Sequence, residues 1–282
     1  MSEHVAVVTD STALLPPEVA DKLGIRIVPL RVTLGARTAL DGVDVTPGEV
    51  AEALRAKVAV TTSRPTPAEF ATVYRDCLDA GATAIVSVHL ASTLSGTWES
   101  ASLAAQDFEH GTVRVVDSRS TAMALGYAVL AAAGQAQAGA SAAQVQGAAV
   151  ETVDRTRAMF YVDTLEYLRR GGRIGNAAAL LGTSLSVKPL LQMVEGRVVA
   201  VEKVRTAAKA LARLVQLTVD AAGSGPVDVA VHHLDAAARA EEVAAALRAA
   251  LPALAELRVS ELGAVVGAHL GPGVIGAVVV RR

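Results

Sequence analysis

The sequence predicts an α/β protein of two domains, and three observations support this. Short runs rich in Val and Ile alternate with longer segments of helical pattern, which is typical of βα units around a parallel sheet. Several helical segments open on recognisable start signals. Near residue 156 a small, polar, helical stretch gives way to the strand-like run "AMFYVDTL". We therefore place one domain over residues 1–156 and a second over 157–282, and a chain of 282 residues can bury two modest cores.

The first domain alternates strands and helices along the chain. Its expected strands are Val5 to Val8, Ile25 to Leu30, Val58 to Val60, Ala84 to Val88 and Val113 to Val116. Helices are expected to begin after Thr46, Thr66 and Ser141, because each hydroxyl is followed three positions later by Glu or Gln, the capping-box spacing. Proline directly after both threonines strengthens two of these starts. These elements predict a parallel sheet with helices between its strands.

The second domain is expected to be a mixed sheet with helices on one face. The segments "SVKPLLQMV", from Ser186, and "RVVAVEKV" are interpreted as strands joined by a turn at Glu195-Gly196. Helices are expected from about 206 to 222 and from about 235 to 250. This order indicates a two-layer α+β domain beside the parallel one.

The composition narrows the class of ligand and the compartment. With 26 basic and 28 acidic residues and only 3% aromatics, the chain lacks the charge and the stacking platforms of a nucleic-acid-binding protein, so a small ligand is favoured. The single cysteine, Cys77, excludes an internal disulfide and a cysteine-rich zinc site. The start "MSEHVAVVTD" has no signal-peptide pattern, and the apolar run "MALGYAVLAAA" of 11 residues is too short to span a bilayer. We expect a cytoplasmic protein.

Hydroxyl side chains gather where the predicted strands of the first domain end. Four such clusters are Thr9 to Thr12, Thr61 to Ser63, Ser92 to Thr97 and Asp117 to Thr121. In a parallel sheet these points share the carboxyl edge, where open α/β folds bind ligands. Hydroxyls and backbone N–H groups at helix starts suit a carboxylate or a phosphate, although each cluster taken alone also fits an ordinary helix cap. We expect Thr62, Ser95 and the N–H of Gly96 to hold a carboxylate.

The sequence also contains a possible serine hydrolase site and a possible metal site, and both are weaker candidates than the carboxylate site. Ser95 could be a nucleophile with His89 or His269 as its base, but the G-x-S-x-G elbow is absent, so a serine hydrolase stays as an alternative only. His232-His233 with Asp235 resembles a metal cluster; adjacent strand histidines point to opposite faces, which favours a polar cap at a strand end. No P-loop occurs in the sequence.

The segment "GPGVIG" matches G-x-G-x-x-G but lacks the context of a dinucleotide site. That motif opens a helix and is followed by an acidic residue about 20 positions later. Here only six residues follow Gly276, and they read as a last strand. The glycines are therefore expected to form a turn that places His269 at its mouth.

With these motifs assembled, the sequence resembles the DegV family of bacterial fatty-acid-binding proteins. The matching segments follow one another over nearly the whole chain: "VVTDSTALLP", "TTSRPTPAEF", "STLSGTWESA", "VRVVDSRSTAMALG", "YVDTLEYLRRGGRI", "SVKPLLQM", "EKVRTAAKAL" and "GAHLGPGVIG". The resemblance implies a three-layer α/β/α first domain and a two-layer mixed-sheet second domain that enclose a long-chain fatty acid in an interdomain tunnel.

The resemblance also implies a carrier without catalytic residues, metal or cofactor. It would present the carboxylate to a separate ATP-dependent fatty-acid kinase, giving an acyl phosphate for phospholipid synthesis, with transient contact to a membrane surface. The residues that correspond to carboxylate contacts are Thr62, Ser63, Ser92, Ser95, Gly96 and His269, and those that correspond to head-group or kinase contacts are Arg170, Arg173 and Arg205. A receptor for another carboxylate or phosphate metabolite is a further alternative to the hydrolase.

The chain departs from the usual family pattern at four positions. Arg64 stands where glutamine is common, Ala91 where a serine is common, Trp98 where tyrosine is common, and Ala268 where threonine precedes the histidine. The expected carboxylate contacts are all retained, while the surrounding network has fewer hydroxyls.

Overall fold

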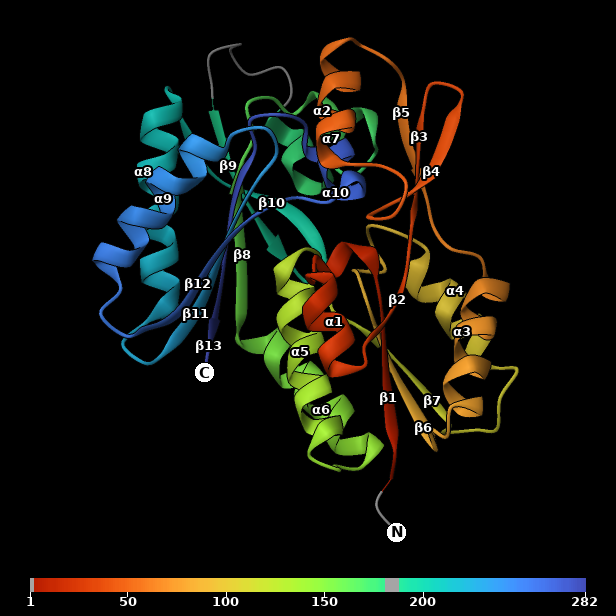
Figure 1. Cartoon of the computed structure of the whole chain (residues 1–282). Coiled ribbons are helices and arrows are strands. Elements are labelled where there is room, and N and C mark those ends of the chain that lie inside the picture. Colours follow the sequence, from red (N-terminus) through yellow and green to blue (C-terminus); the bar gives the residue numbers. More distant parts are fainter. Residues whose placement is uncertain (1–2, 181–187) are drawn as a thin grey trace. The chain divides into compact units, whose positions relative to one another are not determined.

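The computed structural model describes residues 3–180 and 188–282 (Figure 1). Its contacts divide the chain into two compact units. Unit 1 comprises Met1–Arg31 and Ser63–Asp154, and unit 2 comprises Val32–Thr62 and Arg155–Arg282. No helix in the described part of the chain is long and apolar enough to cross a membrane.

Unit 1 is built on a four-stranded parallel sheet. The strand order is β2 (Arg26–Val28), β1 (Val5–Asp10), β6 (Ala84–His89) and β7 (Val113–Asp117). The two central strands, β1 and β6, are buried on both faces, which explains their continuous Val and Ile runs.

Helices cover both faces of this sheet (Figure 1). On one face, Phe70 and Tyr74 of α3 (Pro67–Asp79) and Ala101 of α4 (Thr97–Ala105) pack on Val8 and Ile85. On the other face, α5 (Met123–Gln137) packs against β1 and β6, with α1 (Pro17–Leu23) beside it. The helix α6 (Ala142–Arg155) follows α5, and a short 3-10 turn, η1 (Ser11–Ala13), follows β1. The predicted three-layer α/β/α arrangement is confirmed.

Unit 2 contains a six-stranded mixed sheet. The strand order is β10 (Arg197–Val204), β9 (Lys188–Val194), β8 (Thr156–Tyr161), β13 (Ile275–Arg281), β11 (Val227–His233) and β12 (Leu254–Glu261). All neighbours pair antiparallel except β11 and β12, which are parallel. The helices α8 (Ala207–Ala222) and α9 (Ala237–Ala250) cover one face through a core that includes Tyr161, Leu214 and Val231. The predicted two-layer mixed-sheet domain is confirmed. Residues 186 and 187 of the predicted strand from Ser186 lie outside the described residues.

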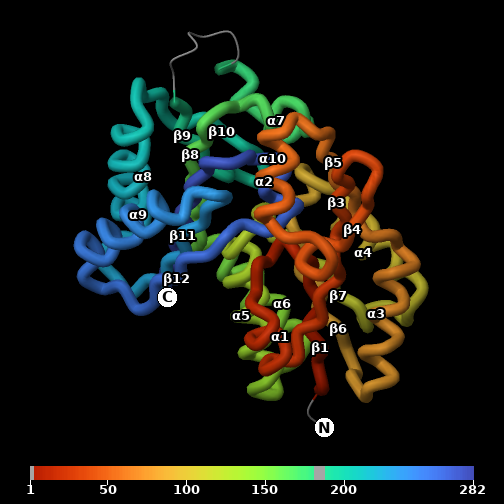
Figure 2. The backbone as a smooth tube through the Cα atoms, turned by 45° about the horizontal axis from the view of Figure 1, so that its top comes forward, coloured from red at the N-terminus to blue at the C-terminus, as the bar shows by residue number. Residues whose placement is uncertain are grey.

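Unit 2 also contains three short segments: α7 (Glu166–Arg170), the 3-10 helix η2 (Gly175–Leu180), which contacts β10, and α10 (Ala264–Leu270). The helix α10 packs against α7 and against α2 (Pro47–Arg55), and Figure 2 shows the three helices grouped together.

The segment 32–62 belongs with unit 2 rather than with the first 156 residues. It carries α2 and most of a three-stranded sheet of order β4 (Arg37–Leu40), β3 (Arg31–Leu34), β5 (Val60–Ser63). The backbone N–H of Ala264 donates to Asp41 Oδ1 at 2.9 Å, and Arg55 forms an ion pair with Asp235. Contacts between residues far apart in the sequence therefore decide this division, whereas the second break in the chain falls at residues 154 and 155, close to the boundary predicted at 156.

The expected strand Val58 to Val60 is not a strand of the parallel sheet. The strand in this region, β5, begins only at Val60 and belongs to the three-stranded sheet. Lys57 has a left-handed φ of 57°, and Val58 is 41% exposed. A central parallel strand is buried on both faces, and this segment is not.

The local start and turn signals are confirmed. Thr46 and Thr66 form complete capping boxes with Glu49 and Glu69, each with proline in the first turn. Ser141 and Gln144 make the same reciprocal bonds at the start of α6. The turn Glu195-Gly196 has φ of 46° and 75°, the two positive values that a tight hairpin between β9 and β10 needs.

Candidate functional site

Thr62 and His269 meet within unit 2. Thr62 lies on β5 and His269 on α10, and Thr62 Oγ1 is 2.8 Å from His269 Nε2. Thr62 is half-buried, while its neighbours Thr61 and Ser63 are exposed, as expected for alternating side chains of a strand. The structure therefore brings together two of the six predicted carboxylate contacts, from positions 207 residues apart.

His269 is uncharged at neutral pH. Burial, with a smaller effect of the nearby positive charge of Arg173, lowers the pKa of His269 to about 4. Its Nδ1 atom is buried without a hydrogen-bond partner. A neutral imidazole offers one N–H donor and one acceptor, so this pair can donate to an anion but cannot form a charged ion pair with it.

The "GPGVIG" segment forms a turn followed by a strand. Gly271 has a φ of 78° and lies against the ring of Tyr167, and Gly273 has a φ of 86° and lies against the carboxylate of Asp163. A side chain at either position would overlap these groups. The next element is β13, not a helix, so the interpretation as a turn after His269 is confirmed.

In unit 1, three of the four hydroxyl clusters lie at the carboxyl edge of the parallel sheet, after β1, β6 and β7. The fourth, Thr61 to Ser63, is on β5 of the other, three-stranded sheet. The expectation that all four share one sheet edge is therefore wrong. Its cause is the assignment of Val58 to Val60 to the parallel sheet.

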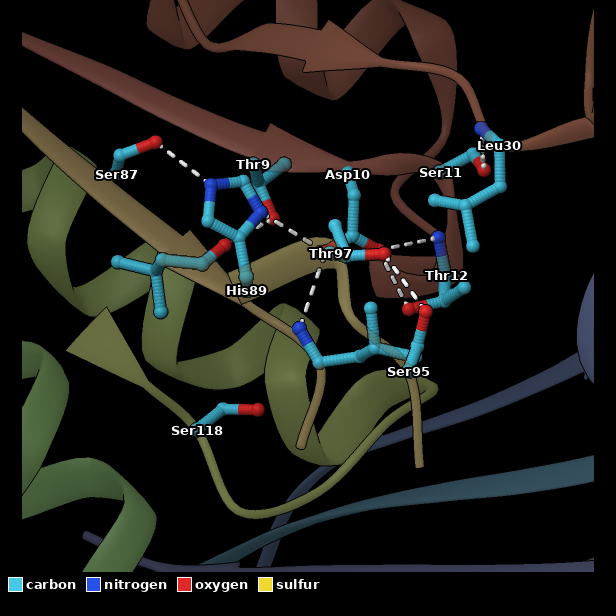
Figure 3. A network of polar contacts seen from close by, with 12 residues as sticks. Thr9, Asp10, Ser11, Thr12, Leu30, Ser87, His89, Ser95, Thr97 and Ser118 are labelled. Atoms are coloured by element: carbon cyan, nitrogen blue, oxygen red, sulfur yellow. Dashed lines mark hydrogen bonds and ion pairs between the residues drawn. The ribbon is translucent and has the colours of Figure 1, made fainter. Parts of the chain in front are cut away.

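Asp10 is the centre of a buried network that joins β1 to β6 (Figure 3). Its Oδ1 accepts the backbone N–H and the hydroxyl of Thr12, at 3.0 and 2.6 Å. Its Oδ2 accepts the N–H of Leu90 at 3.0 Å and lies 3.0 Å from His89 Nδ1. The ring of His89 is held from its other side by Ser87, because Nε2 is 2.7 Å from Ser87 Oγ. This carboxylate fixes the loop that begins after β6.

In this network Ser87, His89 and Asp10 contact one another in the order of a catalytic triad, but these contacts have a structural role. Ser87, His89 and Asp10 are each 0% exposed, and Ser87 also accepts a hydrogen bond from Tyr74 at 2.9 Å. A nucleophile has to reach its substrate, and this serine is enclosed between a strand and α3. His89 therefore has a structural role in the core, with both ring nitrogens engaged, and does not serve as a base for Ser95.

The loop from 91 to 97 carries three of the six expected carboxylate contacts, Ser92, Ser95 and Gly96. Ser92 donates its hydroxyl to Asp117 Oδ2 at 2.6 Å, which uses its single proton. Ser95 Oγ lies 2.9 Å from Thr97 Oγ1, so this pair shares one bond and retains one proton that can be donated to a ligand. Gly96 is the residue before α4, and the guanidinium of Arg64 donates to its carbonyl at 3.3 Å. The N–H groups at the start of α4 suit an anionic oxygen.

The three predicted arginines differ in their surroundings. Arg170 bonds Glu166 at 2.7 Å on the surface of α7, and with Arg169 it lowers the pKa of Glu166 to about 2. Arg173 donates to the carbonyl of Gly171 at 2.6 Å and lies near enough to His269 to affect its pKa. Arg205 is exposed at the end of β10. Of the three, Arg173 is the one that unit 2 places beside the Thr62–His269 pair.

The adjacent histidines of β11 act as predicted for a strand end. Burial lowers the pKa of His232 to about 4, and its Nδ1 lies 3.0 Å from Ser260 Oγ on β12. His233 Nδ1 accepts the N–H of Ala236, at 3.5 Å, before α9. Asp235 is paired with Arg55 instead.

Sequence reasoning missed Gly171 and Asp41. A Cβ at Gly171 would overlap His269 Nδ1, and Asp41 anchors the first turn of the helix that carries His269. In the sequence, the "RRGGRI" segment points to a function through its arginines, and nothing indicates which of its glycines meets the histidine ring.

Comparison with known proteins gives a consistent result over the full chain. A family model described as "Uncharacterised protein, DegV family" matches residues 4–282. A DegV domain-containing protein of Streptomyces coelicolor is 52% identical over 282 residues, covering 100% of both chains.

Two solved structures are also similar. One is a DegV family protein from Thermus thermophilus described as binding fatty acid, with a TM-score of 0.91 and 38% identity over 99% of this chain and 100% of that chain. The other is DegV of Bacillus subtilis, described as a fatty acid binding protein, with a TM-score of 0.90 and 33% identity over 100% of both chains. On the full-length family match and these relatives, the chain belongs to the DegV family.

Proposed function

We propose that this protein binds one long-chain fatty acid and holds its carboxylate with Thr62 and His269. The observation that carries the proposal is the 2.8 Å contact between these two side chains, one half-buried hydroxyl and one uncharged imidazole. Solved relatives at 38% and 33% identity are described as fatty-acid-binding proteins, which supports the choice of ligand.

A carboxylate drawn out of water needs several donors to offset its desolvation. We propose that unit 1 supplies further donors from Ser95, from the N–H of Gly96 and from Ser63, whose side chain is exposed. Ser92 is assigned an indirect part, because its proton is bound to Asp117 and its hydroxyl therefore orders the loop that carries Ser95.

The acyl chain requires an apolar surface. In the six-stranded sheet, the face that does not carry α8 and α9 is also apolar, with Phe160, Leu191 and Val278 buried on it. Burial of a long acyl chain contributes about 0.8 kcal/mol for each CH₂ group. We propose that this face lines the tunnel that holds the acyl chain.

We further propose that the protein is a carrier and not itself an enzyme. It would present the carboxylate to a separate ATP-dependent kinase, whose reaction joins a carboxylate oxygen to the terminal phosphoryl group of ATP and releases ADP. The acyl phosphate would then enter phospholipid synthesis, and loading would involve transient contact with a membrane surface. The surface arginines Arg170 and Arg205 are the proposed kinase contacts, and Arg173 the proposed head-group contact.

The hydrolase alternative is not favoured by the contacts of its proposed residues. Ser95 is bonded to Thr97, and Nε2 of His269 is engaged by Thr62. Each of the two side chains thus has a threonine as its hydrogen-bond partner.

The proposal is tested by native mass spectrometry of the purified protein, followed by solvent extraction and identification of what is released. We expect one fatty acid per chain, of about 16 to 18 carbons, because such chains bury enough apolar area to co-purify. An empty protein that hydrolyses ester substrates would support the hydrolase instead. A released polar carboxylate or phosphate compound would support the metabolite receptor.

A further inference from the structure

We propose that Gly171 is a positioning residue that fixes the imidazole of His269 with its proton on Nε2, which frees the hydroxyl proton of Thr62 for the ligand. This inference rests on the proposed function for its consequence, but the state of the ring is defined by contacts inside unit 2. It assigns a task to a glycine of "RRGGRI" that the proposed function leaves unused.

The packing around the ring is the first step. Gly171 directly follows α7, which packs against α10. A Cβ built on Gly171 would overlap His269 Nδ1 and would lie 3.0 Å from Cε1. The hydrogen that glycine carries in that direction therefore faces Nδ1, and no larger residue leaves the ring in its place.

The second step is the position of the ring proton. His269 Nε2 has a partner, Thr62 Oγ1, and Nδ1 is buried without one. A buried N–H without an acceptor is rarer in proteins than a buried acceptor with an unused lone pair. Only the form with the proton on Nε2 avoids an orphaned N–H, and it leaves the bare Nδ1 against the Cα–H of Gly171.

The third step concerns Thr62. When His269 donates to Thr62 Oγ1, the threonine hydroxyl keeps its own proton. Thr62 can then donate to an anionic oxygen while it accepts from the ring, and successive hydrogen bonds of this kind strengthen one another. With the ring proton on Nδ1 instead, Thr62 would donate its hydroxyl proton to Nε2 and would offer only lone pairs to a carboxylate.

Gly171→Ala is a clean probe because the backbone tolerates it. Gly171 has φ −73° and ψ −9°, which alanine adopts without strain. Gly48→Ala is the matched control, since a Cβ there meets only Thr46 Oγ1, at 3.9 Å in the first turn of α2. Circular dichroism and thermal unfolding check that both variants fold.

The ring state is measured first, by the ¹⁵N chemical shifts of the histidine side chains in lipid-free protein at pH 7. His269→Asn identifies the His269 signals by their disappearance among the 6 histidines. We expect a protonated Nε2 and an unprotonated Nδ1. A protonated Nδ1 would overturn the inference, whether or not the protein binds fatty acid.

The action through His269 is measured next, by calorimetric titration of oleate into wild type, Gly171→Ala, His269→Asn and the double variant. We expect Gly171→Ala to lose about tenfold to a hundredfold in affinity, the effect of a lost hydrogen bond to a charged group, and to cost little more once His269 is gone. Equal losses in both backgrounds would overturn the inference. Absence of oleate binding in the wild type would refute the proposed function but leave the ¹⁵N result to decide the ring state.

Discussion

The carboxylate of Asp41 accepts the backbone N–H of Ala264 at 2.9 Å, although 223 residues separate them. Asp41 is 3% exposed and precedes α2, while Ala264 is the first residue of α10. The bond satisfies a donor in the first turn of α10 and places a negative charge where the helix dipole favours it. It thereby joins the segment that carries Thr62 to the helix that carries His269.

Asp41→Ala should therefore destabilise unit 2 and loosen the Thr62–His269 pair. Loss of a buried, charged hydrogen-bond acceptor costs about 1–3 kcal/mol. We expect a decrease of this size in the free energy of unfolding, measured with urea, together with weaker fatty-acid retention. Asp44→Ala, at an exposed position of the same loop, is the control. A stability equal to that of the control would show that Asp41 does not anchor α10.

Asp10→Asn should destabilise unit 1 without removing any proposed ligand contact. The amide would direct an NH₂ group at the N–H of Leu90 or at the donors of Thr12, so at least one buried donor loses its acceptor. We expect a loss of about 3 kcal/mol in the free energy of unfolding. The exposed Asp79→Asn, in the same unit, is the control. If Asp10→Asn unfolds at the same urea concentration as wild type, the network is not a major support of the sheet.

Stability should fall as the pH is lowered from 6.5 towards 4. Unfolded histidine takes up a proton near 6.5, whereas burial lowers the pKa of His232 to about 4 in the folded chain. Between these values the unfolded state binds more protons, so acid favours unfolding, and the contribution is complete only above pH 6.5. For His232 the loss of stability at pH 4, relative to the stability above pH 6.5, is about 3 kcal/mol.

This pH dependence is measured by urea unfolding at pH 7, 6 and 5 for wild type and His232→Leu. The variant should show a shallower decline, because one of the two low-pKa histidines of unit 2 has been removed. Parallel declines in the two proteins would mean that His232 titrates normally in the folded state.

Arg170→Ala should spare fatty-acid binding and impair the kinase reaction. Its side chain is 65% exposed and is paired with Glu166 on the surface of α7, so its removal leaves the Thr62–His269 pair untouched. We expect wild-type lipid occupancy and slower acyl-phosphate formation with a fatty-acid kinase. Arg169→Ala, which loses a contact to the same Glu166, is the matched control. Loss of lipid binding in Arg170→Ala would place this arginine at the ligand instead.

Features set by neighbouring residues could be predicted from the sequence. The capping boxes at Thr46 and Thr66, the hairpin at Glu195-Gly196 and the turn after His269 depend on a few adjacent residues, and all are present. The class of each sheet followed from the spacing of its strands.

Features set by distant contacts could not. The run Val58 to Val60 is too short to indicate which sheet it joins, and its assignment to the parallel sheet placed Thr62 on the wrong edge. The grouping of 32–62 with unit 2 depends on Asp41 and Arg55 meeting residues far along the chain. The sequence indicates the pairing of Thr62 with His269 only through the family resemblance, and the contact of Gly171 with the ring depends on how α7 packs against α10.

The central claim, that Thr62 holds the carboxylate of a bound fatty acid, is tested most directly by lipid occupancy in native mass spectra of four proteins: wild type, Thr62→Val, Thr61→Val and Ser95→Ala. Thr61 is the matched control because it is exposed on the same strand. We expect Thr62→Val and Ser95→Ala to weaken retention by about 1–3 kcal/mol, the cost of an unmet acceptor, and Thr61→Val to match wild type. Occupancy unchanged in both Thr62→Val and Ser95→Ala would contradict the assignment of the carboxylate site.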